Sequence, residues 1–494
     1  MKKSFILLLA LLVLVTGGTC YAQNMLLAER DQVIITENII YGDKSVVEGV
    51  TVNLENQFDY NLFWNTVYEV GETPKTHTDY SFHEWDYYGG AEEVEGSVEF
   101  MQDVFDVYTF GYDTYDIFTG MNLAMKELYD ETEPGTEKMK MVYLKDYIDY
   151  YTFGLNIWFP NEAGESAVDS PYGYEWEEDL RRQIAYMEEE KYPSEEIEEK
   201  KAVLADMKAL HEFFKIPVLS TDACTIAISL GEKKEVLGVA ASHATGGFST
   251  GDMDSPPEPD VDGLDTYYFY TYSVMKDGDC YLTFEPHTMN GNLVDVSHIP
   301  GGFGIYHLTY DETKGRLNVD TLEMVYSLDV NVQIQDMMLD ECGKNFLLFT
   351  SEKGNYYMSI IDRATMTLVE KFDLGDSETS NTVWSYEDYL VAYGDVLSVY
   401  TMDENGRYHL EFSVKDEKIQ DLMNWDCVFD WNGSTLLIGN NLRDSAFRKN
   451  CGFYLAAIDK SGLLYYGEYR SSLECQQDCV PNENVSEPIR VFWN

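Results

Sequence analysis

Short runs of alternating apolar and polar residues dominate the second half of the chain. The apolar runs at 346–349, 389–392 and 435–438 each begin a unit that continues with two further runs, the next of them alternating. Alternation with a period of two places every second side chain on the same face of a β-strand. Two of the turns between runs, at 403–406 and 459–462, contain Asp and Gly, which suit tight connections between antiparallel strands. The pattern therefore predicts a series of small antiparallel sheets.

Two short sequence repeats mark successive units. Ile-Gln-Asp-Met-Met at 334–338 returns as Ile-Gln-Asp-Leu-Met at 419–423, and the pattern SHxxGGF occurs at 242–248 and again at 297–303. These repeats predict units of about 40–55 residues, each with three or four short strands. One small sheet cannot bury both of its faces, so neighbouring sheets must stack on one another.

On these units the chain resembles the broad class of β-propeller proteins, well over residues 224–471 and poorly over the first 200 residues. The resemblance implies an all-β propeller of seven blades, with six and eight blades as alternatives. We expect the strand at 32–36 and the C-terminal strand at 488–493 to share one blade. The resemblance is architectural and implies no activity, because the GH…WD pair and the SxDxGxTW box of named propeller families are missing.

Residues 175–215 differ from the rest of the predicted single domain, 23–494. Apolar residues recur there at helical spacing in two segments separated by Pro193, and Ser194 could cap the second helix. The apolar positions are Trp176, Leu180, Ile184, Met187, Ile197, Leu204, Met207, Leu210 and Phe214. This pattern predicts a helical hairpin inserted into the β-body. It would serve as a lid or docking arm, or as a solvated decoration on one blade.

The N-terminal residues have the pattern of a secretory signal peptide. Two lysines precede an apolar run from Phe5 to Val15, and a small residue, Ala22, suits cleavage. Lipidation at Cys20 and an uncleaved anchor are the alternatives. The apolar run is shorter than the roughly 20 residues that span a bilayer. We therefore expect an extracytoplasmic protein, secreted or at the cell surface, with signal peptide 1–22 and no later membrane span.

Charge excludes two classes of partner. The 494 residues include 88 acidic and 34 basic side chains, a formal net charge of -54. Nucleic-acid binding and attachment to anionic membranes both need clustered Lys and Arg, so neither is expected. The 8 cysteines show no metal-binding spacing and are interpreted mainly as small buried residues, although Cys475 and Cys479 are close enough for a local bridge.

Three groups of residues are candidates for ligand binding. His243 and His298 occupy matching positions of the SHxxGGF repeat, so they could converge near a propeller axis or simply satisfy backbone groups in turns. Trp85, Tyr87 and Tyr88 alternate with acidic residues, as in a sugar-binding or peptide-binding groove or in ordinary strand packing. The segment Asp265-Thr266-Tyr267-Tyr268 likewise places tyrosines close to an acidic residue.

The segment around Glu258, Asp260 and Asp262 resembles the start of a calcium loop, with alternate carboxylates before a glycine. The position expected to carry the bidentate Glu is Phe269, so a solvated acidic loop is the alternative. No cofactor is predicted beyond this calcium hypothesis.

These observations favour an exported, non-catalytic binding or scaffolding protein, monomeric, with a protein or glycan partner at the cell surface. One alternative is a polysaccharide hydrolase, which needs two carboxylates about 5–10 Å apart in a concave site. Another is a calcium-stabilised structural protein. No nucleophile motif such as GxSxG is present.

Overall fold

A computed structural model describes residues 12, 14–21, 34–58, 62–71, 75–82, 97–101, 120–158, 177–244, 246–251, 253–311, 315–376, 382–423, 426–442, 450–474 and 486–493. The chain forms two compact units. Unit 1 comprises Met1–Gly89 and Leu374–Asn494, and unit 2 comprises Gly90–Asp373. Each unit is described by itself.

Unit 1 consists of three antiparallel sheets over the described residues. The first has the order β1-β26-β25-β24-β23, the second β27-β2-β3-β4 and the third β19-β20-β21-β22. Their strands are β1 (Ile35–Gly42), β2 (Val50–Phe58), β3 (Leu62–Glu69), β4 (Lys75–Phe82), β19 (Thr382–Ser385), β20 (Tyr389–Tyr393), β21 (Leu397–Met402), β22 (Tyr408–Val414), β23 (Val428–Trp431), β24 (Leu436–Asn441), β25 (Asn450–Asp459), β26 (Gly462–Glu474) and β27 (Ser486–Trp493). Short helices η2 (Lys44–Val47) and α5 (Glu417–Gln420) lie between strands.

The β24–β25 region of unit 1 is covered on both faces, as expected for stacked sheets. On one side, Leu437 and Leu455 pack with Val52 of the β27-β2-β3-β4 sheet. On the other side, Leu436 and Ile438 join the cluster of apolar residues from β20 and β21. Alternate residues of one strand therefore contribute to two different cores, which is the packing that a period of two allows.

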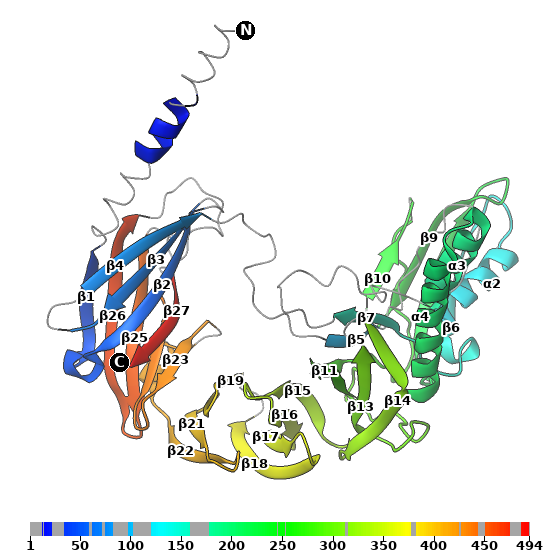
Figure 1. Ribbon diagram of the computed structural model, residues 1–494. Helices are drawn as coiled ribbons and strands as arrows, with labels where there is room; N and C mark the ends of the chain where they lie inside the picture. The colour runs from blue at the N-terminus through cyan, green and yellow to red at the C-terminus, as the bar shows by residue number, and fades with distance from the viewer. Residues whose placement is uncertain are drawn as a thin grey trace, which may run out of the picture. The chain divides into compact units, whose positions relative to one another are not determined.

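The two terminal strands of unit 1 lie in different sheets. β1 pairs with β26, whereas β27 pairs with β2 in the register Val52↔Val491 (Figure 1). The prediction that they share one blade is therefore wrong. Each terminal strand completes a sheet made of strands from the other end of the chain, which ties the two ends together through backbone hydrogen bonds.

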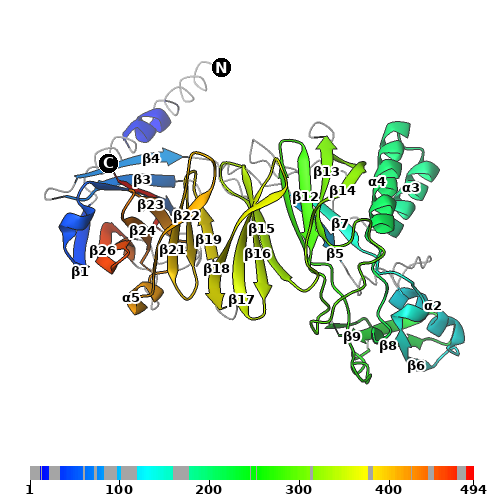
Figure 2. The same cartoon turned by 90° about the horizontal axis from the view of Figure 1, so that it is seen from below.

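Unit 2 contains three four-stranded sheets and one two-stranded sheet over the described residues. Their orders are β10-β9-β8-β6, β11-β12-β13-β14, β15-β16-β17-β18 and β5-β7. The strands are β5 (Ser97–Met101), β6 (Glu137–Tyr143), β7 (Gly154–Trp158), β8 (Ala223–Leu230), β9 (Val236–His243), β10 (Gly246–Ser249), β11 (Thr271–Lys276), β12 (Asp279–Phe284), β13 (Gly304–Asp311), β14 (Arg316–Ser327), β15 (Gln333–Leu339), β16 (Asn345–Glu352), β17 (Asn355–Asp362) and β18 (Thr367–Asp376). Figure 2 shows the β11–β14 and β15–β18 sheets as successive layers.

The predicted helical hairpin is present in unit 2. It consists of α3 (Glu177–Glu190) and α4 (Ser194–Phe213), which pack side by side (Figure 2). Ser194 does not cap α4, because the N-cap is Pro193 and no side chain caps this end. Phe214, at the end of α4, is fully buried against Phe284 and Tyr306 of the β11–β14 sheet. The helix α2 (Gly120–Glu131) and the short η3 (Leu144–Asp146) complete the helices with defined bounds.

The predicted fold class is confirmed. The chain is mostly β-structure, built from small antiparallel sheets of the size of propeller blades, with an inserted helical hairpin. The number of blades remains a prediction. Among the described residues, no helix is long and apolar enough to cross a membrane.

The short repeats do not have matching structures. Ile334 lies in β15, whereas its counterpart Ile419 lies in α5, where the Asp416 side chain accepts a hydrogen bond from the Lys418 backbone N–H. His243 ends β9, whereas His298 lies in a turn before β13. These repeats therefore marked the presence of successive units without marking equivalent positions in them.

The cysteines agree in part with their interpretation. Cys224, Cys280 and Cys427 are buried, whereas Cys342 is exposed. Burial raises the pKa of the Cys224 thiol to about 12, so it is unreactive at neutral pH. Cys475 and Cys479 lie outside the described residues.

Candidate ligand-binding site

The structure places the histidine candidates in different environments. The His243 side chain is fully buried and its Nε2 lies 2.7 Å from the Asp222 carboxylate. The His298 side chain is 44% exposed, with its ring edge-on to Tyr150. Because they occupy neither equivalent positions nor similar surroundings, the repeat does not bring them together in one site. Trp85, Tyr87 and Tyr88 lie outside the described residues.

The structure does not group the carboxylates of the acidic loop as metal ligands, and calcium binding there stays a prediction. Glu258, Asp260 and Asp262 are all exposed. Across the described ranges, no group of three or more His, Cys, Asp or Glu side chains is arranged to hold a metal ion. The three carboxylates therefore do not converge in the way that a calcium loop requires.

A buried carboxylate, Asp222, anchors the region that does form a pocket. Asp222 is 0% exposed and accepts hydrogen bonds from the Tyr151 hydroxyl and the Thr266 hydroxyl, each at 2.6 Å. Together with the contact to His243, these bonds link the segment after η3, the start of β8, the end of β9 and the loop that enters β11. Burial of such a group is tolerated because its oxygens are hydrogen-bonded.

A second buried carboxylate, Asp265, holds the other side of the same loop. It accepts hydrogen bonds from the Thr288 hydroxyl at 2.6 Å and from the Asn292 side-chain amide at 2.9 Å. The Met289 backbone N–H donates to the Thr266 carbonyl at 3.0 Å. These bonds fix the loop before β11 against the turn after β12.

The loop fixed in this way presents alternate tyrosines to solvent. Tyr267 and Phe269 are buried in the core, whereas Tyr268, Tyr270 and Tyr272 line a pocket of about 390 Å³. The full lining is Tyr268, Tyr270, Tyr272, Glu285, His287, Thr288, Met289, Gln333, Ile334 and Gln335. The pocket therefore combines the strand alternation before and within β11 with the turn after β12 and the first residues of β15. We call it the tyrosine pocket.

The aromatic wall of the tyrosine pocket is partly open. The rings of Tyr268 and Tyr270 lie 4.7 Å apart, and Tyr270 is 55% exposed. The Tyr272 hydroxyl donates to the Ile334 carbonyl at 3.1 Å, which joins β11 to β15. Burial, reinforced by the negative charge of Glu285, raises the pKa of Tyr272 to about 12, so this hydroxyl stays protonated at neutral pH.

The polar wall is a carboxylate–imidazole pair. Glu285 bonds to His287 Nδ1 through one oxygen and accepts the Ile334 backbone N–H at 2.6 Å through the other. Both side chains are largely buried, with 14% and 10% exposed. Burial raises the pKa of Glu285 above its usual range, and the hydrogen bond with His287 opposes this rise.

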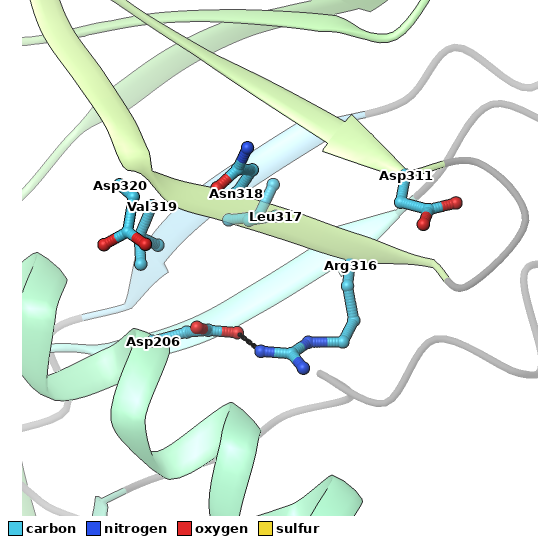
Figure 3. A pocket seen from close by; sticks show the side chains of 7 residues that line it. All are labelled: Asp206, Asp311, Arg316, Leu317, Asn318, Val319 and Asp320. Atoms are coloured by element: carbon cyan, nitrogen blue, oxygen red, sulfur yellow. Dashed lines mark hydrogen bonds and ion pairs between the residues drawn. The ribbon is translucent and has the colours of Figure 1, made fainter.

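A second cavity, of about 310 Å³, lies between α4 and the β13–β14 hairpin (Figure 3). Arg316 reaches the carboxylate of Asp206 on α4 at 2.5 Å, and Asp311 and Asp320 also line the cavity. The Asp206 side chain is only 9% exposed. The ion pair fastens the helical hairpin to the sheet, which gives this cavity a structural role.

Sequence reasoning missed most of the tyrosine pocket. The mixture of aromatic and acidic residues pointed to the segment from Asp265 to Tyr268, but it pointed equally to Trp85 and its neighbours. The alternation at Tyr268, Tyr270 and Tyr272 was a usable signal, because a period of two places these rings on one face. Glu285, His287 and Gln333 are distant in sequence from those tyrosines, and no local pattern connects them.

No model of a known protein family matches the chain, and no curated protein matches it in sequence. Similar solved structures include a candidate 6-phosphogluconolactonase from Bacteroides fragilis, with 8% identity over 91% of this chain and 99% of that chain and a TM-score of 0.29. The Swd1 β-propeller domain from Myceliophthora thermophila has 10% identity over 54% of this chain and 84% of that chain, with a TM-score of 0.25. The periplasmic gluconolactonase of Pseudomonas aeruginosa has the same identity and coverage and a TM-score of 0.23. At these TM-scores, the similarities carry no argument about the activity of this chain.

Proposed function

We propose that this chain is an exported carbohydrate-binding protein whose binding site is the tyrosine pocket. The observation that carries the proposal is the row Tyr268, Tyr270 and Tyr272, which presents aromatic surface beside hydrogen-bonding side chains in a cavity of about 390 Å³. A pyranose ring has apolar C–H faces that pack on aromatic rings and hydroxyls that need hydrogen-bond partners. Export is proposed from the signal-peptide pattern of residues 1–22.

The composition of the pocket favours a sugar over a hydrophobic peptide. Besides the hydroxyls of the tyrosines and of Thr288, the lining side chains Glu285, His287, Gln333 and Gln335 carry hydrogen-bonding groups, and both glutamines are exposed. An apolar peptide side chain would leave such groups without partners, which is costly when they are desolvated. A sugar offers several hydroxyls that can donate and accept at once.

Binding is also favoured over glycoside hydrolysis. Glu285 is the one carboxylate among the ten residues that line the tyrosine pocket. Cleavage of a glycosidic bond by the common mechanism needs two carboxyl groups on opposite sides of that bond. The raised pKa of Glu285 would suit a general acid, so hydrolysis stays as the second candidate function.

The test is binding of the purified protein to a glycan array, followed by titration calorimetry with each sugar that binds. Tyr270→Ala removes an exposed ring from the pocket and should weaken binding about fivefold or more, since a stacking ring contributes about 1 kcal/mol or more. Tyr186→Ala is the matched control, because Tyr186 is similarly exposed, at 58%, on α3. Absence of any glycan binding, or equal losses for the two variants, would contradict the proposal. Release of reducing sugar ends from a bound polysaccharide would favour the hydrolase instead.

A further inference from the structure

We infer that the tyrosine pocket selects uncharged sugars because of the charges around it, and that Nε2 of His287 accepts a hydrogen bond from a hydroxyl of the bound sugar. This inference rests on the proposed function and specifies the chemistry of the ligand. It is carried by the Glu285–His287 pair, by the charges around the pocket and by the exposed amide groups of β15.

The pair leaves His287 with one nitrogen for a ligand. An ionised carboxylate can only accept hydrogen bonds, so the ring proton is on Nδ1, which donates a hydrogen bond to Glu285. In a neutral ring, Nε2 then holds a lone pair. No partner for Nε2 is found within the described part of the chain, and the ring lies in the pocket lining. A hydroxyl of a bound sugar can supply the missing donor.

The position of His287 is set by hydrogen bonds of the neighbouring residues. The second oxygen of Glu285 is held by the Ile334 backbone N–H at 2.6 Å. The next residue, Thr288, is 5% exposed and is tied to Asp265 at 2.6 Å. Glu285 is therefore a positioning residue: it fixes the orientation of the imidazole and the nitrogen that carries its proton.

Charge around the pocket disfavours anionic sugars. None of the ten lining residues is Lys or Arg, whereas Glu285 is acidic. Two further carboxylates lie nearby in the chain, Asp265 in the loop before β11 and Asp336 in β15. A uronic acid or a sugar phosphate would bring a negative charge towards these groups without a cation to neutralise it. An uncharged sugar meets no such cost and can also bond to the amides of Gln333 and Gln335.

The first experiment is a deoxy-sugar scan by titration calorimetry or saturation-transfer NMR. The probes are the methyl glycosides of glucose, galactose and mannose and each of their monodeoxy derivatives. With the unmodified protein, one deoxygenated position should lose about tenfold in affinity, the value of one good hydrogen bond. With His287→Phe, the parent glycoside should be weakened by the same factor, and deletion of that hydroxyl should then cost nothing. His287→Gln is the more conservative second variant, and melting curves check that both variants fold.

The second experiment tests the positioning role of Glu285. Imidazole ¹⁵N shifts should show the proton of His287 on Nδ1 in the unmodified protein. Glu285→Gln lets the new amide donate to Nδ1, so the ring proton should move to Nε2. Removal of the sugar hydroxyl identified in the deoxy-sugar scan should then no longer weaken binding. If Glu285 had only a structural role, the proton of His287 would stay on Nδ1 in Glu285→Gln.

The third experiment compares neutral methyl glycosides with methyl glucuronide and methyl galacturonide. The neutral sugars should bind at least tenfold more tightly to the unmodified protein, and Glu285→Gln should narrow this difference. Binding of uronides as tightly as neutral sugars, or an identical deoxy scan for the protein and His287→Phe, overturns the inference and leaves the proposed function standing. Absence of binding by every glycoside and glycan overturns the proposed function itself.

Discussion

The buried carboxylate of Asp222 offers the sharpest test of how this region is held together. Its side chain is fully buried and meets three polar groups, the hydroxyls of Tyr151 and Thr266 at 2.6 Å and Nε2 of His243 at 2.7 Å. Asp222→Ala removes all three contacts and leaves three buried polar groups without this partner. It also opens a small cavity in the interior of unit 2.

The magnitude follows from the number of buried contacts that the substitution removes. Each buried donor that loses its partner costs about 1–3 kcal/mol, and removal of one member of a buried ionic or polar pair costs about 3–5 kcal/mol. We expect Asp222→Ala to lower the free energy of unfolding by about 4 kcal/mol. For a domain of this size, about 2–4 °C of melting temperature corresponds to each kcal/mol, so the transition should fall by roughly 8–16 °C. Asp222→Asn keeps the volume and one acceptor oxygen, and should cost about half as much.

Differential scanning calorimetry measures the effect on the transition of unit 2. Asp254→Ala is the control, because Asp254 is exposed in the loop before β11 and its removal should change stability by less than about 0.5 kcal/mol. The reasoning is refuted if Asp222→Ala melts within about 2 °C of the parent, or if Asp222→Asn is as damaging as Asp222→Ala. Either result would mean that the three contacts do not stabilise unit 2 through a satisfied carboxylate.

Three further outcomes are expected. Hydrogen bonds, first of all the one with His211, lower the pKa of Glu177 to about 2. The ionised Glu177 therefore stabilises the fold fully above about pH 4.5, and this stabilisation is lost as the pH falls towards 2. Glu177→Gln should destabilise the protein at pH 6 and have no effect near pH 2, as followed by circular dichroism at 222 nm. Phe214→Ala removes a ring that is 0% exposed and should cost about 3–5 kcal/mol, measured as a lower calorimetric transition of unit 2. Arg316→Met leaves Asp206 without its ion pair and should raise hydrogen exchange in α4 about tenfold or more, because a hydrogen bond to a charged group contributes about 1.5–3 kcal/mol.

Each of these outcomes has its own check. Glu199→Gln, at an exposed position of α4, should show the same melting temperature as the parent at both pH values. Phe453→Ala, in the core of unit 1, should lower a different calorimetric transition from the one that Phe214→Ala lowers. The double variant Asp206→Asn/Arg316→Met should recover part of the protection of α4. Equal exchange in the single and double variants would show that the ion pair does not fasten the hairpin.

Much of the fold could be predicted from local pattern. The apolar runs at 346–349, 389–392 and 435–438 correspond to β16, β20 and β24, and the runs after them correspond to the next two strands of each sheet. The turn at 403–406 ends in Gly406 at a φ of 78°, a conformation that glycine adopts without strain. These features depend on neighbouring residues, so a single sequence is enough to reveal them.

Sequence similarity was a poor guide to position within each unit. Gly246 and Gly247 pair with His243 and Ser242 as the return strand of a hairpin, whereas Gly302 in the second copy forms a turn at a φ of 85°. The same seven-residue pattern is compatible with both conformations. The strand partner decides between them, and that partner lies elsewhere in the chain.

By itself, the sequence determined the type of the elements: strands by a period of two, the hairpin by a helical period, and a tyrosine row by alternation. Tertiary structure decided which faces of these elements meet. It placed Glu285 and Gln333 beside Tyr270 to make one pocket, and it paired β1 with β26 and β27 with β2. The physical reason is that periodicity is a property of consecutive residues, whereas a binding site and a strand pairing depend on contacts between segments far apart in the chain.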